Sequence, residues 1–362
     1  MTPTGTTQKE SLLGRTECTT LRGAAILSII IHNYVHLLPG AYSENEYYYS
    51  AEYAGRFLDM LGDGGWLNIQ AFFSFFGHYG VAVFLFLSGL GLGIKYGKGS
   101  TTTEPQRWSF TRYHYLKLLR LLVAGMVLFM IVNALTGRGA ANISIEKIAG
   151  QLTMLSNLNH NQLVFSGPYW FFSLIMEIYI VYILLLHKSS VKFVAIFMLI
   201  CVGIGYMLEP YSYSMVLYRY NFPGHMLPFC LGLIAASLRS DFVREMQRNV
   251  VLPIVGFIIT IPAIMALDLC RWTWLIAPAA VCLNAVFLGM ILMRIKKAAT
   301  PLVWLGGISA MIFVVHPAIR HMFLHIYCKA ELGTIVSYLM VTIAVSWWLK
   351  QLMEKVPIPK LK

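Results

Sequence analysis

The first hydrophobic segment carries ionisable side chains that could do chemistry. Arg22 stands at its start, and His32 and His36 lie in its middle. An ionisable group in hydrocarbon is costly, so such residues usually face protein or water and mark a functional site. Residues four apart share a helix face, so the two histidines are expected to be neighbours. Arg22 precedes His32 by ten positions, about 15 Å of helix, which predicts an arginine at the membrane mouth and a histidine near mid-bilayer.

A histidine in this position has two interpretations. A neutral imidazole can take a proton from a hydroxyl group, as general-base catalysis requires. Alternatively, it only hydrogen-bonds between helices and holds the bundle together. The presence of Arg22 on the same span favours catalysis by His32.

Two further groups suit a phosphate-bearing ligand with a slender arm. Arg112, Lys117 and Arg120 begin the third apolar run and could bind phosphates or anchor anionic lipid; the sequence leaves both readings open. Ser88 and Gly89 lie in a run of small residues in the second span. Small residues admit either a ligand or a neighbouring helix close to the backbone.

Polar residues in later spans are candidates for binding an acceptor substrate. Glu177 lies inside the fourth span, with Tyr169 and Trp170 near its predicted outer end. An intramembrane glutamate needs a partner or a proton. His316 lies inside the ninth span and is followed directly by a proline.

The composition indicates an integral membrane protein. Hydrophobic residues make up 57% of the 362 residues, charged residues 12%, and mean hydropathy is +0.65. The net charge of +12 does not indicate nucleic acid, because the basic residues lie in short segments between apolar runs. The six cysteines lack metal-binding spacing, so no metal is expected. Cys270 and Cys328 could form a disulfide outside the membrane, or act as small apolar fillers like the others.

Ten segments are long and apolar enough to predict an all-α bundle of about ten transmembrane helices in one domain, residues 1–362. They are 18–39, 74–96, 115–136, 168–187, 191–208, 223–238, 250–267, 272–293, 306–327 and 332–350. The sixth contains prolines and is expected to be broken or re-entrant. Of the 28 Lys and Arg, 21 fall on the side of the N-terminus. The positive-inside rule then predicts both termini in the cytoplasm.

The predicted outer loops differ in character. Residues 40–70 are acidic and aromatic, which suits stacking on sugar rings or an interfacial aromatic belt. Residues 137–167 are rich in Asn and Gly and contain SIEKIAGQL, a short helix expected to be capped by Ser144.

Taken in order, several segments resemble the membrane-bound acyltransferase 3 family. They are LRGAAILSIIIH, YGVAVFLFLSGLGL, the F-x-x-R and K-x-x-R pattern at the start of the third span, PYWFFSLIMEIY and LGGISAMIFVVHP. They extend from about residue 18 to residue 318. The resemblance implies a ten-helix enzyme that uses cytoplasmic acyl-CoA to modify a carbohydrate hydroxyl on the other side. It also implies that His32 is the base and Arg22 its partner at the donor end.

One spacing departs from the family pattern. The family usually has ten residues between this arginine and histidine, whereas nine intervene here, so Asn33 occupies the usual offset. One helical position rotates a side chain by about 100°. His36 is therefore the alternative base.

The expected function is transfer of an acyl group, most simply acetyl from acetyl-CoA, to a hydroxyl of a cell-surface or lipid-linked glycan. The expected partners are acyl-CoA, a carbohydrate or glycolipid acceptor and the lipid bilayer, without nucleic acid. The expected location is a bacterial inner (cytoplasmic) membrane. The alternatives are a proton-coupled transporter or flippase for a glycolipid or small molecule, and an acyltransferase-like sensor without turnover. The absence of Walker A, GxSxG and HExxH motifs excludes no more than those particular chemistries.

Overall fold

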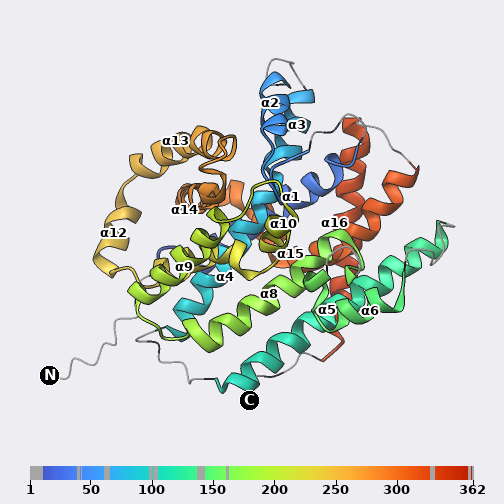
Figure 1. Ribbon diagram of the computed structural model, residues 1–362, viewed down its shortest axis with the longest axis horizontal. Coiled ribbons are helices and arrows are strands. Elements are labelled where there is room, and N and C mark those ends of the chain that lie inside the picture. The colour runs from blue at the N-terminus through green and yellow to red at the C-terminus, as the bar shows by residue number, and fades with distance from the viewer. Residues whose placement is uncertain are drawn as a thin grey trace.

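The computed structural model describes residues 11–38, 41, 43–60, 66–97, 100, 105–136, 143–159, 163–326, 331–357 and 360. These residues form helices and connecting turns, without a strand, and the predicted all-α fold is confirmed (Figure 1). The predicted pairing of Cys270 with Cys328 lies outside the described residues on the Cys328 side.

The α-helices are α1 Arg15–Val35, α2 Ala51–Met60, α3 Trp66–Phe76, α4 Gly80–Tyr96, α5 Arg107–Leu135, α6 Ile145–Leu152, α8 Trp170–Val181, α9 Val191–Tyr206, α10 Tyr213–Tyr220, α11 Met226–Ala236, α12 Ser240–Arg248, α13 Val251–Asp268, α14 Ala277–Arg294, α15 Lys296–Ile326 and α16 Leu332–Glu354. Short 3₁₀ turns are η1 Gly77–Tyr79, η2 Ser156–Asn159, η3 Gly167–Tyr169, η5 Phe222–His225 and η6 Trp274–Ile276, and η4 Tyr182–Leu186 is a π-helix.

All ten predicted spans coincide with helices, but the count of ten is approximate. Within the described residues, seven helical stretches are long and apolar enough to cross a membrane, or eight if a bent pair is one span. The predicted first and fifth spans fall outside this count. The first, α1, carries charged residues at its start, and the fifth, α9, is only 16 residues long.

The sixth span was expected to be broken or re-entrant at its prolines, but the helix is not bent there. Pro223 lies in η5 at the start of the segment, where a missing N–H costs no helical hydrogen bond. The 100° bend instead comes after Ala236, between α11 and α12. Ser144 caps α6 as expected, its side chain accepting a hydrogen bond from the Lys147 amide at 3.3 Å.

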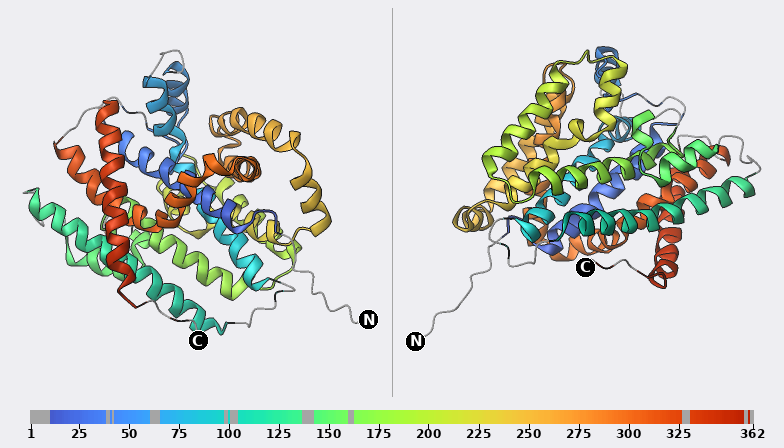
Figure 2. Two further views of the ribbon diagram at one scale, coloured as in Figure 1. Left: turned by 180° about the vertical axis from the view of Figure 1, so that it is seen from behind. Right: turned by 60° about the horizontal axis from the view of Figure 1, so that its bottom comes forward.

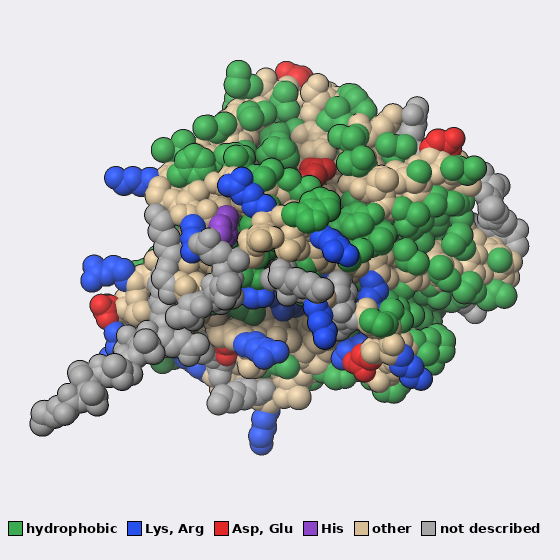
Figure 3. Space-filling view, turned by 90° about the horizontal axis from the view of Figure 1, so that it is seen from below, with side chains coloured by type: hydrophobic (Ala, Val, Ile, Leu, Met, Phe, Trp, Pro, Cys, Tyr) green, Lys and Arg blue, Asp and Glu red, His purple; other side chains and the backbone are tan. Residues whose placement is uncertain are grey.

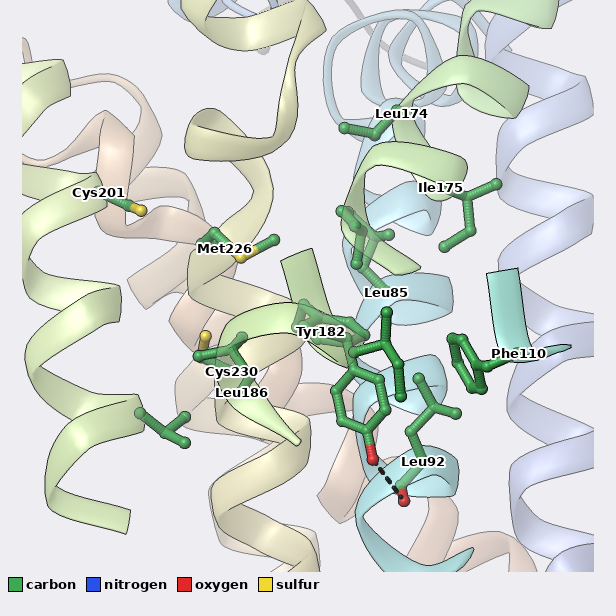
Figure 4. Close-up of a cluster of buried hydrophobic side chains, with 14 of the residues drawn as sticks. Leu85, Leu92, Phe110, Leu174, Ile175, Tyr182, Leu186, Cys201, Met226 and Cys230 are labelled. Atoms are coloured by element: carbon green, nitrogen blue, oxygen red, sulfur yellow. Dashed lines mark hydrogen bonds between the residues drawn. The ribbon is translucent and has the colours of Figure 1, made fainter. Parts of the chain in front are cut away.

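Two pairs of helices approach closely enough to require glycine. A Cβ on Gly306 of α15 would lie 1.8 Å from the Thr19 carbonyl oxygen of α1. A Cβ on Gly89 of α4 would lie 2.1 Å from the Phe229 carbonyl oxygen of α11. Such contacts bring backbones together without a side chain between them. They pack α1 against α15 and α4 against α11, and the adjoining apolar core around Leu85 is drawn in Figure 4.

The helices give the molecule two distinct ends. α2 and α3 project at the top of Figure 1, whereas the start of α5 and the C-terminal end of the chain lie at the bottom (Figures 1 and 2). Lys and Arg side chains gather on the bottom face, with hydrophobic side chains beside them (Figure 3). α1 runs through the interior between these ends, so residues along it can connect the two.

Candidate active site

A cavity of about 230 Å³ lies beside the C-terminal half of α1. One part of its wall is polar and includes His32, Asn33, His36, Glu44, Glu46, His78 and Arg320. The other part is largely aromatic and includes Tyr47, Trp170, Phe171, Tyr220 and Phe313. The residues come from α1, the segment after it, η1, α8, α10 and α15, so only the folded bundle assembles them.

His32 is held in one orientation at this cavity. Its side chain is buried, and its Nδ1 lies 3.2 Å and 3.1 Å from the carbonyl oxygens of Phe73 and Ser74 on α3. Carbonyl oxygens only accept hydrogen bonds, so Nδ1 carries the hydrogen. When the ring is neutral, its lone pair is therefore on Nε2, the atom that a general base needs. Gly77 of η1 makes this fit possible, because a Cβ there would lie 2.5 Å from the His32 Cβ.

Two glutamates from the segment after α1 reach this ring. An oxygen of Glu46 lies 3.8 Å from His32 Nε2. Burial by itself would raise the pKa of Glu46, but a hydrogen bond from the protonated form of His32 and the charges of His78, His32 and Arg219 hold that pKa below the usual range. Burial raises the pKa of Glu44, against the charge of His32. The pair therefore supplies one ionised carboxylate beside the imidazole.

The backbone of this segment is anchored from α10. Arg219 donates from Nε to the Glu46 carbonyl oxygen at 2.7 Å. The Tyr47 ring stacks on that of Tyr220, with centroids 4.3 Å apart, and meets Trp170 edge-on at 6.1 Å. These contacts fix an aromatic wall beside the His32–Glu46 pair.

Two more histidines surround His32. The His36 ring stacks on the His32 ring with centroids 4.7 Å apart, as the i,i+4 spacing predicts. Its Nδ1 lies 3.0 Å from the His32 carbonyl oxygen, so Nδ1 carries the hydrogen of this ring as well. His78 approaches edge-on at 5.7 Å, is 5% exposed, and neither of its ring nitrogens has a hydrogen-bond partner among the described residues.

Of the four predicted acceptor residues, Trp170 lines the cavity. Tyr169 is fully buried and donates to the Val314 carbonyl oxygen at 2.8 Å. Glu177 accepts a hydrogen bond from the Phe222 amide at 2.9 Å. His316 is fully buried, with Nδ1 3.3 Å from its own helix carbonyl at Ile312, and it is not among the lining residues.

The predicted donor-binding residues separate into two groups. The charges of Arg22 on α1 and Lys95 on α4 both act on Lys117 of α5, and these three residues are called the Arg22–Lys117 cluster below. Arg120 points elsewhere, into a groove formed with Met353 and the segment after α16. Arg112 is exposed, like Lys117.

The small residues of α4 make local contacts. Ser88 donates to its own helix, to the Phe84 carbonyl oxygen at 2.8 Å. Gly89 is covered by the backbone of α11 near Phe229.

The sequence reasoning missed several cavity residues: Glu44, Glu46, Tyr47, His78, Tyr220 and Arg320. The acidic and aromatic composition of residues 40–70 was the available signal for the first three. The others carried no signal distinguishing them from loop charges or packing residues. The ligand atoms of His32, Glu44 and Glu46 lie within 4.8 Å of one another, close enough to hold a divalent cation.

A family model described as an acyltransferase domain, acyltransferase 3, matches residues 18–351. The chain belongs to the acyltransferase 3 family. It is therefore a membrane acyltransferase, and the matched range includes both the His32 cavity and the Arg22–Lys117 cluster. No curated protein matches this acyltransferase. No solved structure matches it either.

Proposed function

We propose that this acyltransferase moves an acyl group, most simply acetyl, from acyl-CoA to a hydroxyl of a cell-surface or lipid-linked carbohydrate, with His32 as the general base. The observation that carries the proposal is the orientation of His32. Two backbone carbonyls hold its Nδ1–H, and Nε2 is directed to the cavity side where Glu46 lies. Because Nδ1 already carries a hydrogen, the neutral ring accepts a proton at Nε2.

The reaction balances with these groups. The acceptor hydroxyl gives its proton to His32 Nε2 as its oxygen bonds to the thioester carbonyl carbon. The resulting tetrahedral intermediate collapses, the carbon–sulfur bond breaks, and the CoA thiolate takes up the proton. Glu46, ionised beside Nε2, stabilises the imidazolium between these two proton transfers. No metal is required.

The two ends of α1 suit the two substrates. The Arg22, Lys95 and Lys117 cluster offers cations for the phosphates of CoA. The rings of Tyr47, Trp170 and Tyr220 form a wall of the kind on which sugar faces stack. About 15 Å of helix separates Arg22 from His32, a distance that the extended pantetheine arm of CoA would have to cover.

The proposed location is the bacterial inner membrane, with both termini and residues 97–114 in the cytoplasm and residues 40–70 outside. The asymmetry of 21 basic residues against seven supports this orientation. An impermeant maleimide applied to intact cells is expected to leave a cysteine introduced at Ser100 unlabelled. Labelling from outside would reverse the assignment of donor and acceptor ends.

The decisive experiment measures free CoA thiol released by the purified protein in lipid nanodiscs, supplied with acetyl-CoA and a surface-glycan extract. The proposal expects CoA release that depends on the extract, with acetyl groups found on the glycan by mass spectrometry. Activity should survive EDTA. A protein that releases no CoA from any acyl-CoA, or acetylates only amines, would contradict the proposal.

A further inference from the structure

Arg320 of α15 is a half-buried cation without an acidic partner. Its Nη1 donates to the Asn33 backbone oxygen at 3.2 Å and to Asn33 Oδ1 at 3.1 Å. Across the described ranges, no carboxylate lies within ion-pair distance of it. A guanidinium inside a membrane bundle is costly unless an anion or water compensates it.

Arg320 stands where two cavities meet. It lines the His32 cavity and also a second cavity of about 410 Å³, and Gly167 borders both. The second cavity also has Lys147 and His321 in its wall, and none of its lining residues is Asp or Glu. A Cβ on Gly167 would lie 3.8 Å from Arg320 Nη2, so the absence of a side chain there leaves this edge of the guanidinium uncovered.

The two cavities that Arg320 lines therefore differ in charge. Glu44 and Glu46 lie at the His32 end, and the ionised carboxylate of Glu46 repels an anion from that end. The second cavity attracts an anion, because its wall contains Arg320, Lys147 and His321 and no acidic residue. Arg320 and His32 line the same cavity, so an anion held by Arg320 lies in the cavity that contains the base.

We propose that Arg320 binds an anionic group, a carboxylate or phosphate, on the acceptor, so that a hydroxyl of the same molecule is directed to His32. The planar guanidinium is well suited to two parallel hydrogen bonds with either group. This inference rests on the proposed transfer to a carbohydrate. The phosphates of CoA have the same chemistry, but the Arg22–Lys117 cluster already serves them at the other end of α1.

The test measures thermal stabilisation of the full-length protein in nanodiscs by matched probes. Methyl glucoside is neutral, whereas methyl glucuronide and glucose 1-phosphate carry a carboxylate and a phosphate on the same ring. Adenosine 3′,5′-bisphosphate represents the donor. The variants are Arg320→Gln, which keeps an amide donor for Asn33 but no charge, and Arg320→Lys, which keeps the charge without the planar fork.

The anionic sugars are expected to bind the wild-type protein more tightly than methyl glucoside. Arg320→Gln should weaken them roughly tenfold to a hundredfold while leaving methyl glucoside unchanged, with Arg320→Lys between. High salt should reduce the difference between the sugars. The inference is overturned if the three sugars bind equally, or if Arg320→Gln weakens neutral and anionic sugars alike.

Two controls separate this inference from neighbouring ones. If Arg320→Gln abolishes binding of the bisphosphate and Lys117→Gln does not, the anion belongs to the donor and the proposal is wrong. His32→Ala should keep the preference for anionic sugars even though it stops CoA release. An anion preference in a protein that never releases CoA would leave the Arg320 site standing and contradict only the proposed function.

Discussion

The two ends of α1 carry ionisable groups in opposite arrangements. At one end, His32 is buried, fixed by two carbonyl oxygens and placed beside the carboxylate of Glu46. At the other, the charges of Arg22 and Lys95 both act on Lys117, which is exposed. The first arrangement depends on the position of individual atoms, and the second on the number of charges. Substitutions at the first end should therefore lower turnover by amounts that depend on the residue replaced, whereas those at the second should weaken donor binding in a salt-sensitive way.

The largest effect is expected from His32→Ala. Removing a general base typically costs about 10² to 10⁴ in rate, while the phosphate contacts remain, so CoA release should stop and acyl-CoA binding persist. His36→Ala should be milder, because the ring packs on His32 but is not the one beside Glu46. His316→Ala should be milder still. Assays of CoA release with the three variants check this order; a dead His36→Ala beside an active His32→Ala would make His36 the base.

At the other end, loss of charge should weaken donor binding without abolishing turnover. Each charge-assisted contact with a phosphate contributes roughly 1.5–3 kcal/mol, or about 10- to 150-fold in affinity. Lys117→Gln should lose this much affinity for acyl-CoA, because Lys117 belongs to the Arg22–Lys117 cluster.

Arg120→Gln is the matched control, since Arg120 lines a different groove, and its effect should be smaller. Equilibrium binding of acyl-CoA at two salt concentrations measures both variants, with Arg112→Gln as a third. If a variant that combines all three substitutions binds acyl-CoA as tightly as wild type, these residues anchor lipid instead.

A carboxylate beside the base should matter for turnover more than for binding. Glu46→Gln keeps the shape but removes the charge that stabilises the imidazolium, so kcat should fall roughly tenfold, or ~1.4 kcal/mol, with the KM for acyl-CoA unchanged. Glu46→Asp should recover part of the loss. Steady-state kinetics separates the two constants. An equal rise in KM would show that Glu46 acts through the fold of residues 43–50 instead.

The smallest effect concerns stability and pH. Burial raises the pKa of Glu44, so folding favours its protonated form. Its contribution to stability is therefore lost as pH rises from the ordinary glutamate pKa, about 4.3, through the raised value. Glu44→Gln removes this loss. The difference in thermal midpoint between the variant and the wild type should therefore be larger at pH 8 than at pH 5, by roughly 1–3 °C in favour of the variant. Thermal unfolding at both pH values tests it; a difference independent of pH would contradict it.

Part of the site could be predicted because it follows from position along one helix. The pairing of His32 with His36 needs only the helical repeat, and the separation of Arg22 from His32 needs only the rise per residue. The grouping of Arg112, Lys117 and Arg120 was less predictable. Lys117 and Arg120 are three residues apart and share a helix face, so only the packing of α5 shows that Arg22 acts on Lys117 while Arg120 lines a separate groove.

The sequence by itself determined the helical membrane fold and the positions of Arg22, His32 and His36 along the first span. These follow from hydropathy, spacing and the basic bias, which act locally. Tertiary structure alone decided that Glu46 and Tyr47 fold back onto His32, that His78 joins them, and that Arg320 meets Asn33 across almost the whole chain. The reason is physical: a buried polar group takes whatever partner packing brings near, and these partners are remote in sequence.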